Sequence, residues 1–237
     1  MVNTRYENVT SPTPQEAKII PQPPLELPRP DGNLIPLVPH DKIVVPPMDL
    51  RTAVETRRSL RKYAETPLTQ NELSYLLWVS QGVKHLSTRP STARTVPSAG
   101  ARHAFETYLL ANRVEGITPG LYRYMAIENG LVSLNLAQDI AHKIADACEQ
   151  QPQVEQANAT FIWVAVVERM FWRYVERGYR YLHLDAGHVC QNLALGAEQV
   201  GCGICPIAAY DDVALNTLLG LDGENLFVVY LASLGKK

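Results

Sequence analysis

Apolar residues recur along this chain with two different periods, and together they predict helices and strands in mixed order. Between residues 181 and 200 they return at every third or fourth position, which is the spacing of one face of a helix. Residues 161–167 form a continuous apolar run that is typical of a buried strand. Further strands are predicted at residues 105–111, 204–210 and 226–231. Because strands and helices do not alternate strictly, the pattern favours an α+β fold.

Capping and turn residues mark where several of these elements begin and end. Asp49 is predicted to cap a short helix that runs to about residue 58. Thr69 and Glu72 form a capping box that opens a second helix, and Gly82 ends it. The Asn-Gly pair at 129–130 predicts a hairpin between strands at 121–127 and 131–136. Helices are also expected at residues 137–149, at 170–177 and after an acidic cap near Asp211 or Asp212, whereas residues 84–101 are polar and irregular.

The first 48 residues differ in composition from the rest of the chain, since they hold eleven of its seventeen prolines. No apolar periodicity in this stretch predicts a helix, so we expect an extended N-terminal arm at residues 1–48. Its content of leucine, isoleucine and valine exceeds what a solvated tail requires, which favours a strap over the body of the protein or over a partner subunit. Residues 49–237 are then the folded domain.

Composition and charge narrow the classes of function. A chain of 237 residues that is 46% hydrophobic is long enough to bury one good-sized core, so one folded domain is expected. A net charge of −2 gives no electrostatic reason to bind nucleic acid or an anionic membrane, and neither is expected as a partner. No apolar run reaches membrane-spanning length and the first residues lack the apolar core of a signal peptide, so we expect a cytoplasmic protein.

The four cysteines do not have the spacing of a disulfide framework or of a zinc site. Cys148 and Cys190 stand isolated, and Cys202 and Cys205 form a Cys-x-x-Cys pair. A redox dithiol at this pair is one alternative. However, reactive pairs of this kind open a helix, which lowers the thiol pKa, whereas this pair follows a helix predicted to end at Gly201. Buried, unreactive thiols are the preferred interpretation, and no metal site is expected.

Residues 57–63, Arg-Arg-Ser-Leu-Arg-Lys-Tyr, concentrate positive charge in an otherwise nearly neutral chain, and we call them the cationic segment. Arg57 and Arg61 are four positions apart, so they share a face whether the segment is helical or extended. Together with Arg58 and the hydroxyl of Ser59, they match the acceptor oxygens of a phosphate monoester. The alternative is a solvated helix end, where cations favour the free carbonyl groups.

Two further stretches combine small residues in a way that suits close contact with a flat ring. Pro97, Ser98, Ala99 and Gly100 form a loop in which the Ser98 hydroxyl can meet polar groups of a ligand; an ordinary turn is the alternative. We call residues 97–101 the small-residue loop.

The second stretch, Gly201, Cys202 and Gly203, is the glycine turn, and it can present backbone N–H groups without side chains in the way. A simple helix C-cap at Gly201 is compatible with that role. Lysines at the chain end are usually solvated, but Lys236 is a further candidate cation for a phosphate site.

The cationic segment resembles the signature that opens the nitroreductase-like flavoproteins. Other points of resemblance follow in order between residues 49 and 235, and together they are similar to the SagB-type dehydrogenases, which are related to the azoline oxidases of thiazole- and oxazole-containing peptides. These points are Pro-Ser-Ala-Gly-Ala at 97–101, Pro-Gly-Leu-Tyr-Arg-Tyr at 119–124, Ala-Gly-His at 186–188 and Leu-Leu-Gly-Leu-Asp-Gly at 218–223.

The resemblance implies a nitroreductase-like fold, with a central mixed or antiparallel sheet flanked by helices, and a homodimer with two FMN sites at its interface. Arg57, Arg58, Ser59 and Arg61, joined by Lys236, are implied to hold the FMN phosphate. The glycine turn is implied to lie at the edge of the flavin ring. The small-residue loop is implied to reach the flavin that the other subunit mainly binds.

Azoline oxidases often carry a Lys-Tyr pair just before the long helix as acid and base groups, and this chain has Arg180 and Tyr181 at that point. Tyr181 is therefore a candidate proton donor or acceptor, with a half-buried structural aromatic as the alternative. Arg180 holds its proton in proteins, so it can orient or stabilise negative charge but is a poor base. The departure from lysine weakens the expectation of azoline oxidation.

These expectations define an FMN-dependent oxidoreductase that takes hydride from a small or peptide-derived heterocycle. One alternative is an NAD(P)H-dependent reductase of nitro compounds or quinones. Another is a flavin-binding protein without turnover, which the Arg180 departure motivates. A fourth, a thiol or metal protein built on Cys202 and Cys205, predicts bound metal and no flavin.

Overall fold

The computed structural model describes residues 2–9, 12–88 and 90–237 and is built on one sheet of seven strands. Every neighbouring pair of these strands is antiparallel, which decides between the mixed and the antiparallel sheet. The order across the sheet is β1-β6-β5-β4-β7-β9-β8. The strands are β1 Ile35–Pro36, β4 Phe105–Ala111, β5 Gly120–Met125, β6 Gly130–Asn135, β7 Ala159–Val166, β8 Cys202–Ile207 and β9 Leu226–Lys236.

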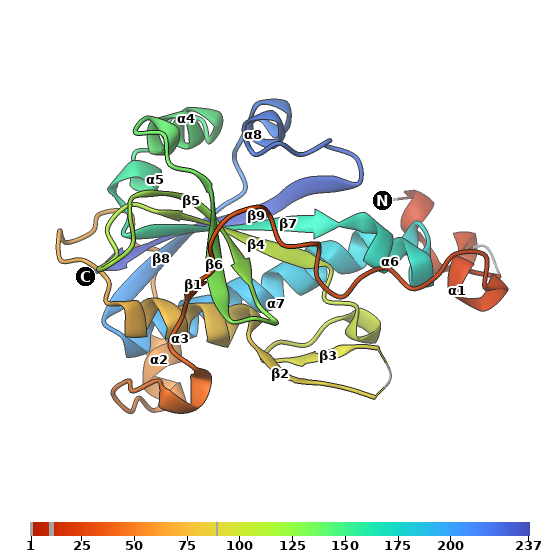
Figure 1. Ribbon diagram of the computed structural model, residues 1–237, viewed down its shortest axis with the longest axis horizontal. Helices are drawn as coiled ribbons and strands as arrows, with labels where there is room; N and C mark the ends of the chain where they lie inside the picture. The colour runs from red at the N-terminus through yellow and green to blue at the C-terminus, as the bar shows by residue number, and fades with distance from the viewer. Residues whose placement is uncertain (1, 10–11, 89) are drawn as a thin grey trace.

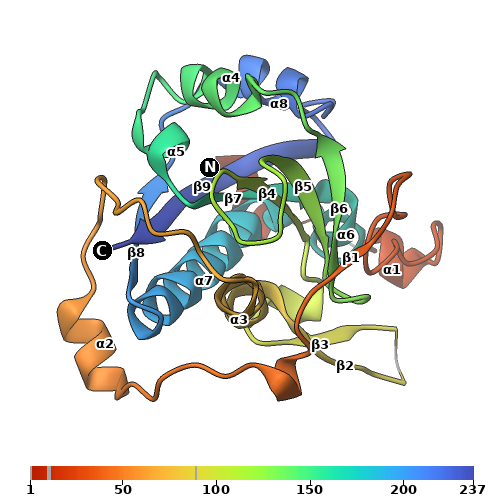
Figure 2. The ribbon, with the colours of Figure 1, turned by 60° about the vertical axis from the view of Figure 1, so that its left-hand side comes forward.

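Helices cover both faces of this sheet and make three layers (Figures 1 and 2). One face carries α3 Gln70–Gln81, α6 Val167–Tyr174 and α7 Arg177–Gln199, and the other carries α4 Ile140–Ala147, α5 Gln153–Gln156 and α8 Asp212–Leu218. Strand β7 shows how two cores arise from one buried run. Phe161 and Trp163 pack into the core beneath α3 and α7, whereas Ile162 and Val164 pack into the core beneath α4 and α8, because successive side chains of a strand point to opposite faces.

Local sequence signals placed several elements correctly. Asp49 caps α2, Leu50–Thr56, by accepting the Thr52 N–H, and the predicted capping box of Thr69 with Glu72 opens α3. The Asn-Gly hairpin joins β5 to β6, and Asn129 adopts the positive φ of 53° that such a turn requires. The long helix was also confirmed, although α7 begins four residues before the predicted start.

Three features differ from the sequence-based expectations. Residues 84–101 were expected to be irregular, but β2 Val83–Leu86 and β3 Thr92–Arg94 form a separate two-stranded sheet. Strand β9 continues to Lys236, five residues past its predicted end, because it pairs along its length with both β7 and β8. The arm was expected to lack helix, but its described residues form four short ones. They are the 3-10 helices Val2–Thr4, Tyr6–Asn8 and His40–Lys42, and α1 Pro14–Ala17, which Thr13 and Glu16 open with a capping box.

The arm runs along the body of its own chain, from the start of α7 past the β5–β6 hairpin to α2 (Figures 1 and 2). Its middle part adds β1 to the edge of the sheet beside β6. Further along, Asn71 exchanges two hydrogen bonds with the backbone of Val44, and Gln199 donates to the Pro46 carbonyl. The packing of the arm in this chain is therefore that of a strap.

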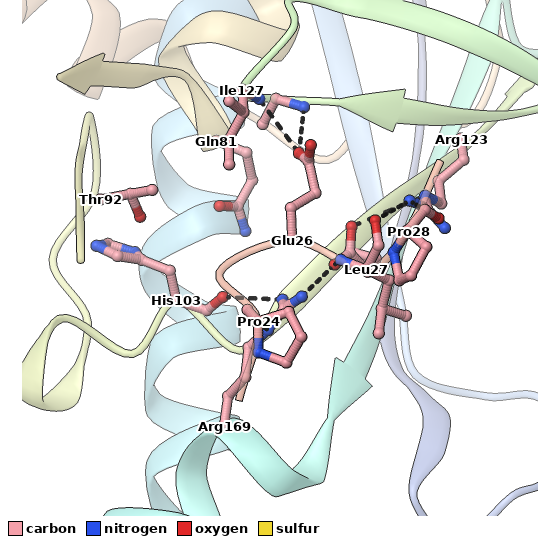
Figure 3. Close-up of polar contacts among 12 residues, drawn as sticks. Pro24, Glu26, Leu27, Pro28, Gln81, Thr92, His103, Arg123, Ile127 and Arg169 are labelled. Atoms are coloured by element: carbon pink, nitrogen blue, oxygen red, sulfur yellow. Dashed lines mark hydrogen bonds and ion pairs between the residues drawn. The ribbon is translucent and has the colours of Figure 1, made fainter. Parts of the chain in front are cut away.

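A cluster of buried charges fastens the strap to the sheet (Figure 3). Arg169 forms an ion pair of 2.5 Å with Glu106, and both side chains are almost fully buried. Arg169 also donates to the Pro24 carbonyl, and Arg123 donates to the carbonyls of Leu27 and Pro28. Since buried guanidinium groups need acceptors, the backbone of the strap completes the hydrogen bonding of the core.

Candidate functional site

The cationic segment lies along the outer edge of β8. Arg57 ends α2 as its C-cap, and its N–H donates to the Ala53 carbonyl. Two residues later, Ser59 forms a parallel bridge with Ile204, and the Leu60 N–H donates to the Ile204 carbonyl at 2.8 Å. The strand β8 is the last of the sheet and contains Cys202 and Gly203, so these contacts bring the cationic segment against the glycine turn as well.

The glycine turn allows this close approach. A Cβ on Gly203 would lie 2.8 Å from the Leu60 Cβ, which is closer than real Cβ contacts come. Gly201 adopts a φ of +66°, which favours glycine, and its N–H donates to the Glu198 carbonyl at the end of α7. The turn therefore ends the long helix, as the C-cap interpretation of Gly201 predicts, and Gly203 makes room for the cationic segment. The presentation of backbone N–H groups to a flat ring stays a prediction.

Positive charge at this edge is largely uncompensated. Across the described residues, Arg57, Arg58, Arg61 and Lys62 form no ion pair with a carboxylate. Arg58, Ser59 and Arg61 are exposed and Arg57 is half-buried. Burial raises the pKa of the Cys205 thiol, while the neighbouring Arg61 guanidinium acts in the opposite direction. An anion with several acceptor oxygens would fit beside these groups.

Lys236 is near the same turn but is already paired. Its ammonium group contacts the Glu72 carboxylate at 2.5 Å and the Val200 carbonyl at 3.1 Å. Partial burial by itself raises the pKa of Glu72, but Lys236 and the Thr69 backbone N–H together hold that pKa below its ordinary value. The charge of Lys236 is therefore balanced within this chain, unlike the charges of the cationic segment.

The small-residue loop lies against the first half of α7. The Ala99 N–H faces both carboxylate oxygens of Asp185 at 3.3 Å, and the Ser98 hydroxyl accepts a hydrogen bond from the His103 N–H at 2.9 Å. Burial raises the pKa of Asp185, although Ser98 and Ala99 donate to it and act in the opposite direction. Gly100 has a φ of +56°, and a Cβ there would lie 2.4 Å from the Tyr174 hydroxyl oxygen.

One chain thus keeps the two groups of predicted cofactor residues apart. The small-residue loop meets α7 at Asp185, whereas the cationic segment and the glycine turn lie beyond its C-terminal end at Gln199. Fourteen residues of α7 separate Asp185 from Gln199, and a helix rises about 1.5 Å per residue, so the two groups lie about 21 Å apart along α7.

Arg180 and Tyr181 lie at the start of α7, on the side of the small-residue loop. The Tyr181 ring meets the Tyr174 ring edge to face at 4.8 Å, and Tyr174 in turn contacts Gly100. The Arg180 guanidinium donates to the Thr4 hydroxyl of the arm at 3.0 and 3.2 Å. The structure therefore groups Tyr181 with the small-residue loop and gives Arg180 a contact with the strap.

Burial explains why the cysteines make a poor redox site. Cys202 and Cys205 are three positions apart in β8, so their side chains point to opposite faces and do not meet. Burial raises the pKa of the Cys202, Cys190 and Cys148 thiols to about 12. Among the described residues, no group of three or more metal-ligating side chains comes together.

Sequence reasoning missed Asp185 and Tyr174, which position the small-residue loop. A signal for Asp185 was present, because it stands three residues after Leu182 on the buried face of α7, where a carboxylate needs a partner. Tyr174 gave no comparable signal, since its role depends on how α6 and α7 meet. Within the described part of the chain, no helix combines the length and the apolar character needed to cross a membrane.

Comparisons with known proteins point to one family. The Nitroreductase family model matches residues 54–236. A protein of Methanocaldococcus jannaschii, provisionally named nitroreductase MJ1384, is 36% identical over 163 residues, which cover 69% of this chain and 80% of that protein. The trifolitoxin-processing protein TfxB of Rhizobium leguminosarum bv. trifolii is 27% identical over 63% of this chain, and the microcin B17-processing protein McbC of Escherichia coli is 25% identical over 56%.

Solved structures share the fold. A nitroreductase-type protein from Anabaena variabilis matches 79% of this chain with a TM-score of 0.65 and 28% identity. The E. coli microcin synthetase McbBCD complex matches 78% with a TM-score of 0.63 and 19% identity, and the NADPH:FMN oxidoreductase of Vibrio harveyi matches 79% with 0.56 and 17%. These matches cover 38%, 72% and 68% of the other chains. This chain also spans only 41% of TfxB and 50% of McbC.

Proposed function

This chain belongs to the nitroreductase family of oxidoreductases, and from that premise we propose that it is an FMN-dependent enzyme that works as a homodimer. The observation that carries the proposal is the cationic segment, whose four positive side chains lack carboxylate partners across the described residues. A structural NADPH:FMN oxidoreductase relative from V. harveyi gives independent support for the choice of cofactor.

The residues beside β8 fit a phosphate monoester. Arg57 and Arg61 would hold the phosphate with charge-assisted hydrogen bonds, and Arg58 and the Ser59 hydroxyl would add further donors. Lys236 would join them only weakly, because Glu72 already pairs with it. At the glycine turn, nothing lies within 4 Å of a Cβ at Gly201, so a flat ring would be able to approach the backbone there, whereas Leu60 fills the space at Gly203.

The separation of the two groups supports a dimer. A site that needs both the cationic segment and the small-residue loop cannot form inside one chain, because the two lie about 21 Å apart along α7. Two chains packed with their long helices antiparallel would bring the loop of one beside the segment of the other. Each site would then contain Arg57 and Arg61 from one subunit and Ser98, Ala99 and Gly100 from its partner.

When bound, FMN supplies an isoalloxazine ring that takes up a hydride from a C–H centre or from NAD(P)H. The protein's own part is to hold the substrate, exclude water and manage protons. We propose a small or peptide-derived heterocycle as substrate, as in the SagB-type branch, because two relatives are named for processing the peptide products trifolitoxin and microcin B17. The McbBCD complex suggests that a modifying partner assists in such systems.

Tyr181 is the candidate group for proton transfer, because it lies beside the small-residue loop through Tyr174. Arg180 stays charged and would orient a substrate or stabilise negative charge. Replacing Tyr181 with Phe keeps the ring and removes the hydroxyl. We expect kcat to fall about 100-fold or more, with FMN content unchanged, since positioned acid–base groups contribute about that much. An unchanged kcat would make Tyr181 a purely structural ring.

Purified protein tests the proposal directly. Its visible absorbance spectrum should show bound flavin, and chromatography of the released cofactor should identify FMN. Mass loss of two hydrogens from an azoline peptide would establish the heterocycle activity. Flavin bleaching by NAD(P)H followed by turnover of a nitroaromatic compound would instead establish the reductase alternative. Colourless protein that does not take up added FMN would overturn the proposal.

A further inference from the structure

A cavity of about 500 Å³ lies between the strap and the junction of α6 with α7. Residues of the strap line one side of it, and residues of α6 and α7 line the other. Its lining includes Tyr6 and Glu16 from the strap, and Arg173, Tyr174, Arg177 and Tyr181 from the helices. The cavity therefore shares Tyr181 and Tyr174 with the surroundings of the small-residue loop, but it lies apart from the cationic segment.

Two guanidinium groups give this cavity a positive wall. Among the described residues, neither Arg173 nor Arg177 forms an ion pair with a carboxylate. One nitrogen of Arg177 donates to the Thr4 carbonyl, whereas its Nε is buried without a hydrogen-bond acceptor. That Nε is enclosed by protein, so the terminal nitrogens are the part of this guanidinium that can offer charge-assisted hydrogen bonds to an anionic ligand in the cavity.

A third guanidinium stands behind the wall. Arg102 and Arg173 both lie beside Gly100, because the Arg102 Nε donates to the Gly100 carbonyl at 3.0 Å and a Cβ on Gly100 would lie 3.1 Å from the Arg173 Nε. Burial lowers the pKa of Arg102, and repulsion from Arg173 lowers it further. The Glu16 carboxylate is the one acid on the cavity lining, and its Oε2 accepts from the Thr13 N–H in the capping box of α1. Two cations against one carboxylate leave the lining with a net positive charge.

Aromatic rings line the rest of the cavity. Tyr174 and Tyr181 pack edge to face, and the Arg177 guanidinium lies over the Tyr181 ring at 5.2 Å. Tyr6 adds a third ring from the strap. Flat rings and planar guanidinium groups together favour a planar ligand, because rings can stack on both and a carboxylate can accept two parallel N–H bonds.

We propose that this cavity binds a planar organic anion, an aromatic or heteroaromatic ring that bears a carboxylate, with the carboxylate on Arg173 and Arg177 and the ring against Tyr174 and Tyr181. Its assignment as the substrate pocket rests on the proposed function. That assignment is motivated by contact with the small-residue loop, since a Cβ on Gly100 would lie 3.1 Å from Arg173 Cδ and Nε.

Calorimetric titration of the full-length protein with benzoate and with benzamide tests the binding site. These probes have nearly the same shape, but only benzoate is charged. We expect benzoate to bind at least about tenfold more tightly, because each charge-assisted contact is worth about one to two decades in affinity. Equal affinities would overturn the proposal, as would an absence of benzoate binding.

Variants then locate the charge. Arg177→Gln and Arg173→Gln should each weaken benzoate binding about 10- to 100-fold. The benzoate affinity of Arg177→Lys should lie between the affinities of these variants and that of the parent protein. Arg51→Gln is the matched control, because Arg51 is an exposed arginine paired with Glu55 on α2. Arg173 is exposed, so its variant should fold even if the Arg177 variant does not. Benzoate affinities equal to that of the Arg51 control would overturn the proposal.

The same samples separate this inference from the flavin function. Benzoate binding by colourless protein would support the anion site and count against the FMN proposal. A flavin-containing protein that does not distinguish benzoate from benzamide would do the reverse. A benzoate-dependent change in the visible flavin spectrum, lost in Arg173→Gln, would support both and place the anion beside the ring.

Discussion

Arg61 differs from its cationic neighbours because its guanidinium group reaches the Cys205 thiol on β8. Arg57 is held as the C-cap of α2, so its backbone is also fixed. Lys62 has neither attachment among the described contacts. A positively charged group holds a ligand best when its position is set before binding, since less rotamer entropy is lost. The positions in this segment should therefore contribute unequally to cofactor binding.

The first prediction follows from this inequality. Arg57→Ala and Arg61→Ala should each weaken FMN retention by about 10- to 100-fold, because a charge-assisted hydrogen bond contributes about 1.5–3 kcal/mol. Lys62→Ala should change it much less. Fluorescence titration of the flavin-free proteins with FMN measures all three. Similar losses at every position would mean that the segment acts as a diffuse positive field.

Gly203 gives a second prediction at the same scale. Gly203→Ala places a methyl group 2.8 Å from Leu60 Cβ, so the cationic segment must move away from β8. We expect a loss of about 1–3 kcal/mol in the free energy of unfolding, as in other overpacked sites, together with weaker FMN binding. Urea denaturation measures the first effect.

Gly187→Ala is the matched control. Nothing lies within 4 Å of a Cβ at this exposed position of α7, so the methyl group meets no neighbour. Alanine favours helix over glycine by up to about 1 kcal/mol, so this variant should be neutral or more stable. A Gly203→Ala variant as stable as the control would mean that the segment is not packed against β8 in solution.

At the scale of elements, the strap is held by ionisable groups whose charge depends on pH. The Glu26 carboxylate accepts the backbone N–H groups of Ala126 and Ile127 at the β5–β6 hairpin (Figure 3). Burial, followed by repulsion from Glu106, raises the pKa of Glu26 above its ordinary value of 4.5. A raised acid pKa means that ionisation costs more in the folded protein than in the unfolded chain.

The effect of Glu26→Gln on the stability of the folded protein should therefore become more favourable as the pH rises. Stability from the protonated Glu26 is fully present below about pH 4.5 and is lost as the pH rises through the raised folded pKa. Glutamine keeps an acceptor oxygen for both N–H groups and has no charge to lose. Urea denaturation measures the free energy of unfolding of both proteins. Relative to the parent protein, the Glu26→Gln variant should be more stable at about pH 7.5 than it is at about pH 4.5.

Glu128→Gln serves as the comparison for this pH series. Glu128, on the same hairpin, pairs with Arg29 of the strap, and the two side chains are 40% and 46% exposed. Solvent screens such a pair, so its removal should matter little at either pH. If Glu26→Gln shows the same small, pH-independent effect, the carboxylate of Glu26 is not buried against the β5–β6 hairpin.

Local chemistry made most elements predictable, and long-range pairing explains the misses. Asp49, Thr69 and the Asn-Gly turn act within four residues, so the sequence around each is sufficient. The β2–β3 pair was missed because residues such as Lys84 and His85 are polar and exposed, and no apolar alternation marks them. The capping box at Thr13 and Glu16 was readable but was overlooked among the prolines of the arm.

The candidate site was predictable as residue types but not as an arrangement. Residue chemistry marked the cationic segment as an anion site, and the turn at Gly201 was expected. Nothing in the sequence indicated that Glu72 would neutralise Lys236, since 164 residues separate them. Nor could the positions of the small-residue loop and the glycine turn at opposite ends of α7 be derived without the fold.

At the scale of the whole molecule, the proposed dimer makes a prediction about stoichiometry. Consider a mixed dimer of one Arg61→Ala chain and one Gly100→Ala chain. If each site combines the cationic segment of one chain with the small-residue loop of the other, both defects fall in the same site. The second site is then intact, and the mixed dimer should bind about one FMN per two chains with parental affinity.

Differently tagged chains, co-expressed and purified in two steps, provide the mixed dimer, and flavin absorbance gives the stoichiometry. The two unmixed variants are the controls, because each carries one defect in every site and should bind weakly. If every site is built within one chain, the mixed dimer has one defect in each and shows no recovery. That result would refute the shared site while leaving flavin binding itself intact.

The borders of the seven-stranded sheet have a consequence for handling this protein. One edge is the two-residue strand β1, which ends in Pro36 and therefore offers few free N–H groups to a strand of another molecule. The other border, β8, is shielded by Leu60 of the same segment that is proposed to grip the cofactor. Removing the flavin would loosen the packing of Leu60 on β8, and the exposed edge of β8 would then pair with strands of other molecules. Loss of the yellow colour and the onset of aggregation should therefore occur together.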